Sequence, residues 1–216
     1  NKDRQAERLE ELKKACEYLG FRLAITKEGG LEKISVKTRE REPAVWNTAV
    51  ENIRNILACN MPAVIFIPHA ADLNSTHTGT HFLVTDAIKR MPTEYKPLVA
   101  ETEFWGSMTN PNLMVRLEVR EVADLIAALS CHAGEIKRNP YHLRLPAWME
   151  DNVRRGAELV GDQGGTAPDY AFASLYRLRR WSGTDFEAVV QPGRFVDSKD
   201  DLRSVFGELL NRKPQA

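Results

Sequence analysis

The segment 68–81 holds the densest group of chemically versatile side chains in this chain. It reads PHAADLNSTHTGTH and contains three histidines, one aspartate, one asparagine and several hydroxyl groups. Histidine and carboxylate side chains bind divalent metal ions, and a catalytic zinc site uses about three protein ligands and leaves one position open for water. The spacing differs from the H-E-x-x-H pattern of zinc proteases. The segment therefore indicates a metal or polar site without defining its ligand set.

Each of these residues also has a purely structural interpretation. A polar segment is typical of a solvated turn, in which Asp72 and Asn74 cap the backbone and Thr76 is the N-cap of the next helix. His81 follows His77 by one helical turn, and we expect it to be a hydrogen-bonded packing residue and not a second ligand. These alternatives stay open at the level of sequence.

Other candidate residues lie further along the chain. Glu101 and Glu103 end the next predicted strand, where they either face the same crevice or are simply solvated. His132 either contributes to a site or is a structural residue at a helix end, where the helix dipole favours a cation. Tyr141 can line a sugar site, whereas core packing is the simpler role for the nearby Trp148.

The elements around segment 68–81 place it where α/β proteins bind ligands. Residues 63–67 form a continuous apolar run, typical of a strand buried on both faces of a parallel sheet, and we expect it at the centre of the fold. A helix is predicted over 77–90 and a strand over 98–104, which together make a parallel crossover unit. Ligands of open α/β sheets bind beyond the carboxyl ends of such strands.

The rest of the chain continues the alternation of helices and strands. Its 216 residues show no repeat and no interdomain linker. We therefore predict a single domain over 1–216, with a Rossmann-like three-layer α/β/α architecture, a mostly parallel sheet and a C-terminal extension over 180–216. Further helices are expected over 6–19, 46–60, 120–129, 146–160 and 202–209, strands over 21–25, 113–117 and 170–178, and a glycine-rich loop over 161–165.

Composition excludes several classes of protein. Thirty basic and thirty acidic side chains give a formal net charge of zero, so no global field attracts nucleic acid or an anionic membrane. The longest apolar stretches are far shorter than the ~20 residues of a membrane span. No signal-like apolar core follows the charged start, which predicts a cytoplasmic protein.

Several stretches resemble the PIG-L/LmbE-type de-N-acetylase family. PAVIFIPHAADLNSTHTGTHFLVTDAI is similar to the family's second motif, in which a strand ending in P-H leads into a D-x-[HN]-x-x-H loop and a helix. ALSCHAGEIKRNPYH resembles its A-L-x-x-H-x-S-Q segment, and RRGAELVGDQGGTAPDYAF its closing glycine-rich segment. The opening ERLEELKKACEYLGF is similar to a family helix, so that the resemblance extends from there to about Leu178.

This resemblance implies a hydrolase that depends on zinc or another divalent metal. Its expected substrate is the acetyl amide of an N-acetylglucosamine-type sugar or glycoconjugate. His77 matches the family's metal-ligating histidine. Asn74 occupies the position of a histidine that many members use to polarise the carbonyl or protonate the amine, and Thr76 replaces an aspartate that commonly precedes the metal ligand. Asn74 and His69 are therefore the catalytic candidates, with His69 expected to deliver the proton.

The resemblance also suggests substrate-binding residues. Asp72 is expected to hold substrate hydroxyls or to orient a neighbouring side chain, and His132 and Tyr141 to contact the substrate.

The family's first motif, A-H-P-D-D, has no counterpart in this sequence. In the family it supplies two metal ligands and the general base, so we interpret the sequence as starting downstream of it and expect this chain alone to be inactive. Without the first strands, the run 63–67 would expose an apolar edge and favour homo-oligomers. The alternative hypothesis is a non-catalytic α/β module that binds a saccharide or a partner chain.

Overall fold

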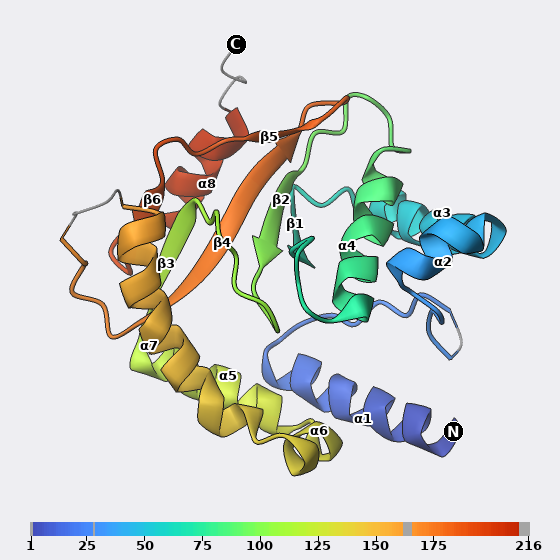
Figure 1. The fold of residues 1–216 in the computed structure, drawn as a ribbon, viewed down its shortest axis with the longest axis horizontal. Coiled ribbons are helices and arrows are strands. Elements are labelled where there is room, and N and C mark those ends of the chain that lie inside the picture. The colour runs from blue at the N-terminus through green and yellow to red at the C-terminus, as the bar shows by residue number, and fades with distance from the viewer. Residues whose placement is uncertain (1, 28, 162–165, 212–216) are drawn as a thin grey trace.

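The computed structural model describes residues 2–27, 29–161 and 166–211. These residues form eight helices and a sheet of six strands (Figure 1). The strands are β1 (Val64–Pro68), β2 (Leu98–Thr102), β3 (Leu113–Leu117), β4 (Phe172–Trp181), β5 (Phe186–Ala188) and β6 (Arg194–Val196). The helices are α1 (Lys2–Tyr18), α2 (Val36–Arg41), α3 (Pro43–Asn60), α4 (Ser75–Ile88), α5 (Val119–Ser130), α6 (Ala133–Arg138), α7 (Tyr141–Leu159) and α8 (Leu202–Asn211).

The sheet is mixed. Its order is β1-β2-β4-β3-β6, and β5 pairs with β4. β1 and β2 are parallel, as are β3 and β6, whereas β4 runs antiparallel to β2 and β3. The predicted α/β class is confirmed, but the mostly parallel sheet is not, because the longest strand lies in the middle and opposes both neighbours. Alternation of apolar residues predicts a strand but carries no information about its direction.

The prediction that 63–67 is the central strand is wrong for the described sheet. β1 lies at the edge, and Phe66 on it is 61% exposed while Ile67 is 3% exposed. An apolar run cannot distinguish a strand covered on both faces from an edge strand packed on one face.

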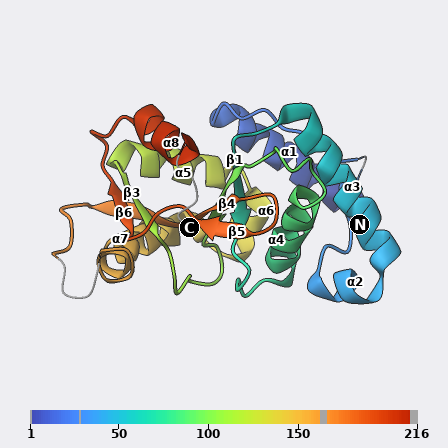
Figure 2. The same ribbon diagram turned by 90° about the horizontal axis from the view of Figure 1, so that it is seen from above.

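Side chains alternate between two apolar layers along the sheet. Val99 and Ile67 pack under α3 and α4, whereas Leu98 and Ala100 belong to the layer covered by α8. α7 packs on β3 and β4, and Figure 2 shows α7 and α8 on opposite sides of the sheet. The β1 end of the sheet therefore carries α3 and α4, and the β3–β6 end carries α7 and α8.

Most predicted helices are confirmed with shifted ends. α7 begins before the predicted 146–160, at Tyr141, and α4 begins at Ser75 instead of 77. The predicted strand 21–25 is irregular, with Phe21 and Ile25 66% and 55% exposed, because no neighbouring strand pairs with it. Most of the predicted loop 161–165 lies outside the described residues. None of the described helices is both long enough and apolar enough to cross a bilayer.

Candidate functional site

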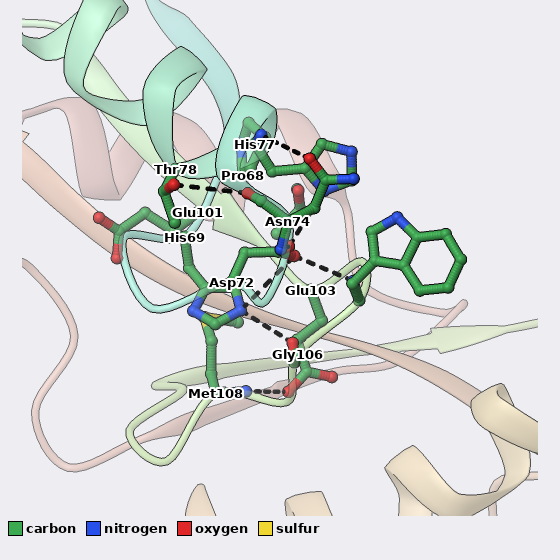
Figure 3. A network of polar contacts seen from close by, with 12 residues as sticks. Pro68, His69, Asp72, Asn74, His77, Thr78, Glu101, Glu103, Gly106 and Met108 are labelled. Carbon is green, nitrogen blue, oxygen red and sulfur yellow. Dashed lines mark hydrogen bonds and ion pairs between the residues drawn. The ribbon is translucent and has the colours of Figure 1, made fainter. Parts of the chain in front are cut away.

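Two loops meet at the carboxyl ends of β1 and β2. Residues 69–74 follow β1 and residues 103–112 follow β2, and the parallel pairing of these strands brings the loops together. The backbone N–H of His69 donates to the carbonyl of Thr102 at 3.1 Å, which continues the ladder into the loops. Figure 3 shows the polar network that forms there, including His69, Asp72, Asn74 and His77.

Asp72 is the centre of this network. Its side chain has no exposed surface. Oδ1 accepts the backbone N–H of Asn74 at 2.7 Å and lies 3.1 Å from His77 Nδ1, while Oδ2 accepts the N–H of Trp105 at 2.9 Å. Burial alone would raise the pKa of Asp72, but the N–H donors of Asn74 and Trp105 and the charge of His77 outweigh it, so the pKa is lowered.

This placement corrects one of the two predicted roles of Asp72. A side chain with no exposed surface and both oxygens engaged cannot hold substrate hydroxyls in this conformation. Its contact with His77 Nδ1 matches the other expectation, which was that Asp72 orients a neighbouring side chain.

His77 is held by its helix as well as by Asp72. The first turn of α4 is capped by Asn74, whose Oδ1 accepts the N–H groups of Thr76 at 2.8 Å and His77 at 3.4 Å. The imidazole is 22% exposed and packs edge-to-face against Phe104, with ring centroids 4.8 Å apart. Because Nδ1 faces Asp72, Nε2 is the ring nitrogen left without a hydrogen bond among the described residues. Metal-ligating histidines commonly have this arrangement, with the second nitrogen held by a carboxylate.

The two predicted catalytic residues have structural contacts instead. Asn74 uses its side-chain oxygen as the cap of α4. The imidazole of His69 is 5% exposed, and its Nε2 lies 2.8 Å from the carbonyl of Gly106 and 4.0 Å from Asp72 Oδ2. Proton delivery to a solvent-accessible substrate by His69 is therefore not supported by this placement, because its bonded ring nitrogen joins the two loops beneath the surface.

Two buried glutamates lie behind the loops. Glu101 pairs with Arg179 and lies 3.7 Å from His81 Nδ1. Glu103 pairs with Arg155 at 2.7 Å and also accepts the N–H of Met108 at 2.6 Å. Both glutamate side chains are 3% exposed, so they are neither solvated nor available to a ligand.

His81 is confirmed as a packing residue. Its Nδ1 lies 2.9 Å from the carbonyl of Pro68. Burial lowers the pKa of His81, and the nearby Glu101 offsets this only in part. A neutral, hydrogen-bonded imidazole of this kind ties α4 to the end of β1.

No sequence motif singles out Arg155, which fixes the second loop. Its guanidinium donates to Glu103 at the start of segment 103–108 and to the carbonyl of Met108 at its end, at 3.1 Å. This holds Trp105 and Gly106 between two anchored ends. The sequence contains only an indirect signal: a glutamate at the end of a predicted strand requires a cation if that strand end is buried.

Tyr141 and His132 have different surroundings. The ring of Tyr141, the first residue of α7, contacts Trp105 edge-to-face with centroids 5.2 Å apart, so it lies beside the second loop. His132 is the N-cap residue of α6, and its hydrogen bonds in the described structure are backbone bonds to the end of α5 and to the first turn of α6. The described contacts therefore connect Tyr141, but not His132, to the loops.

The described residues form no complete metal site. Across residues 2–27, 29–161 and 166–211, no three His, Cys, Asp or Glu side chains gather in a way that could hold a metal ion. His77 fits one ligand position, with Asp72 behind it, but the donors present do not fit a complete zinc site.

Comparisons with known proteins bear on the fold. No family model and no curated protein matches the chain. Three chains of solved structures match. Among them is the crystal structure of the conserved protein TT1542 from Thermus thermophilus, with a TM-score of 0.52 and 16% identity over 79% of this chain and 72% of that chain. At this identity the likeness concerns the fold alone.

Proposed function

We propose that this chain carries one half of the active site of a metal-dependent amide hydrolase of the PIG-L/LmbE type. The observation that supports the proposal is the Asp72–His77 pair at the carboxyl end of β1, which leaves Nε2 of an oriented imidazole for a ligand. Asp72 holds the ring in place through Nδ1, so that Nε2 is the nitrogen that would bind a metal ion. The proposed substrate is the acetyl amide of an N-acetylglucosamine-type sugar or glycoconjugate, and the proposed location is the cytoplasm.

The resemblance supplies the rest of the proposed site. The family's A-H-P-D-D motif would provide the remaining ligands and the base, in a Rossmann-like layered domain. A divalent ion such as Zn²⁺, when bound, polarises the amide carbonyl and lowers the pKa of its water to about 7. This chain contributes His77 as one ligand, and its loops exclude water from the buried side of that imidazole.

The test measures zinc binding and acetate release with the longest form of the protein that its gene encodes. We expect His77→Ala to lower both by at least about 100-fold, because a ligand and its carboxylate partner act together. Ser75→Ala is the matched control, since Ser75 is an exposed residue of the same helical turn and its substitution leaves the cap in place. Zinc content and acetate release that are unchanged in His77→Ala would contradict the proposal.

The second candidate is a saccharide-binding module without catalysis. It is favoured by the incomplete donor set of the described residues together with the exposed aromatic side chains beside His77. Saccharide binding without acetate release in the zinc-loaded protein would support this candidate over the first.

A further inference from the structure

Three large apolar side chains are exposed on the two loops that meet beside His77. Leu73 is 82% exposed, Phe104 is 62% exposed and Trp105 is 41% exposed. They come from the two loops that make the polar network, and we call them the apolar rim. Single exposed apolar residues are common on protein surfaces, but a group beside an oriented polar side chain is typical of a ligand-binding site.

The rim is connected to the polar network through Asp72. One carboxylate oxygen of Asp72 accepts the backbone N–H of Trp105 at 2.9 Å, and the other lies 3.1 Å from His77 Nδ1. One buried side chain therefore sets the position of the Trp105 backbone relative to the imidazole. The ring of Phe104 contacts the imidazole directly.

The two loops also pack tightly against each other. A Cβ atom at Gly106 would lie 3.3 Å from both the carbonyl oxygen of Ala71 and Cγ of Leu73. Tyr141 contacts the ring of Trp105, and Arg155 fastens both ends of segment 103–108. Such a preformed surface loses little conformational entropy when a ligand binds.

The charges of the site favour a neutral ligand. Two arginines behind the loops, Arg155 and Arg179, are both paired with buried glutamates. A phosphate-bearing ligand would need cations that these pairs do not offer. A pyranose ring is neutral and has an apolar C–H face and polar edges, which suit an exposed indole on a loop that Asp72 holds beside an imidazole.

We propose that Trp105 binds the apolar face of an N-acetylated pyranose, with Phe104 as the second wall, and presents the acetamido group to His77. This inference rests on the saccharide part of the proposed function. It goes beyond that function by naming the residues that recognise the sugar ring. Trp105 is a substrate-positioning residue, and the acetyl group alone is not sufficient for recognition.

The arrangement of the tryptophans allows a direct test by fluorescence. Of the four tryptophans, Trp46 and Trp181 are each 4% exposed, whereas Trp105 and Trp148 are 41% and 37% exposed. In a Trp148→Phe background, acrylamide quenching therefore reports mainly on Trp105. The probe is N,N′-diacetylchitobiose in metal-free buffer, and the comparison ligand is N-acetylputrescine, an acetyl amide without a ring.

We expect the disaccharide, but not N-acetylputrescine, to reduce quenching of Trp105. In calorimetry, Trp105→Ala should weaken disaccharide binding by about tenfold or more, whereas Trp148→Phe should leave it unchanged. Circular dichroism and the thermal midpoint check that both variants fold. Trp105→Tyr, which keeps an aromatic face, should restore most of the affinity.

Three results would overturn the proposal: equal protection by both ligands, no protection by the disaccharide at millimolar concentration, or unchanged affinity in a folded Trp105→Ala variant. Because the buffer contains no metal, this experiment does not depend on hydrolysis. Protection of Trp105 combined with no acetate release in the zinc-loaded protein would leave this inference standing and contradict only the hydrolase.

Discussion

The strands β1 and β2 and the strands β3 and β6 end at two halves of the same sheet edge. The charged side chains of the two halves differ in burial. At the β1–β2 half, the side chains of Asp72 and Glu103 are 0% and 3% exposed and satisfy backbone donors of two loops. At the β3–β6 half, Arg116 pairs with Glu118 and Asp197, whose side chains are 46% and 32% exposed. Both halves are polar, yet within the described part of the chain only the first combines buried carboxylates with exposed aromatic rings.

This difference shows what marks a candidate site in this fold. Exposed ion pairs contribute about 0–1 kcal/mol each and hold nothing else in place. A buried carboxylate that accepts several hydrogen bonds fixes the backbone around it. Its burial costs free energy, which is offset only when all of its partners are present. A charged residue at a strand end therefore says little about whether a site lies there. A buried carboxylate beside exposed aromatic side chains is the better indication.

Replacing one arginine in each half should give the largest difference in the free energy of unfolding. Arg155→Met leaves Glu103 buried without its partner, and we expect the free energy of unfolding to fall by about 3–5 kcal/mol. Arg116→Met removes two partly exposed ion pairs, so its effect should be smaller, about 1 kcal/mol. Urea unfolding monitored by circular dichroism measures both. Equal losses in the two variants would remove the distinction between the halves.

A smaller effect is expected when only the charge of Asp72 is removed. Asp72→Asn should lower the free energy of unfolding by about 2 kcal/mol at pH 7, because hydrogen bonds to a charged acceptor are lost. The pKa of Asp72 is lowered from 3.8 in the fold, so its contribution is present above pH 3.8 and disappears as the pH falls through the folded pKa. The difference between variant and native protein should therefore shrink in acid.

Unfolding curves at pH 7 and at acidic pH check this expectation. Asp197→Asn is the control from the other half, and its effect should be smaller because its carboxylate is more exposed. A difference between Asp72→Asn and the native protein that stays constant with pH would show that the carboxylate's charge is not involved.

The smallest change in stability is expected at the sheet edge. β1 is a five-residue edge strand with Phe66 61% exposed, whereas the opposite edge strand, β6, has three residues. We predict that the chain self-associates through β1, and that Phe66→Lys reduces this with almost no change in the free energy of unfolding. Leu143→Lys, at a 70% exposed position on α7, is the control. Light scattering that finds a monodisperse monomer for the native chain would contradict the prediction.

The sequence predicts those features of the structure that depend on the local pattern of apolar residues. Apolar spacing identifies α3, α4 and β2 because it depends on neighbouring residues alone. The direction of β4 and the edge position of β1 depend on pairing with distant segments, which no local period contains. The same limit applies to the mixed character of the sheet.

The residues of the candidate site divide in the same way: neighbours in the sequence are predictable, and contacts between distant segments are not. Asp72 and His77 are five residues apart and belong to one polar segment, so their type and spacing single them out. Arg155 is 52 residues from Glu103, and no motif connects the two. Asn74 fitted both a catalytic and a capping role, and only the geometry of the first turn of α4 separates them.

Gly156 lies outside the loops, at the point where α7 approaches the sheet closely. A Cβ atom there would lie 2.3 Å from Met114 Sδ and 2.8 Å from Leu175 Cδ2, so the absence of a side chain lets α7 rest directly on β3 and β4. Arg155 directly precedes Gly156 on α7, so the helix that rests on the sheet at Gly156 also carries the guanidinium that binds Glu103. With a methyl group at position 156, α7 could keep this distance from the sheet only if the flexible ends of the Met114 and Leu175 side chains moved aside.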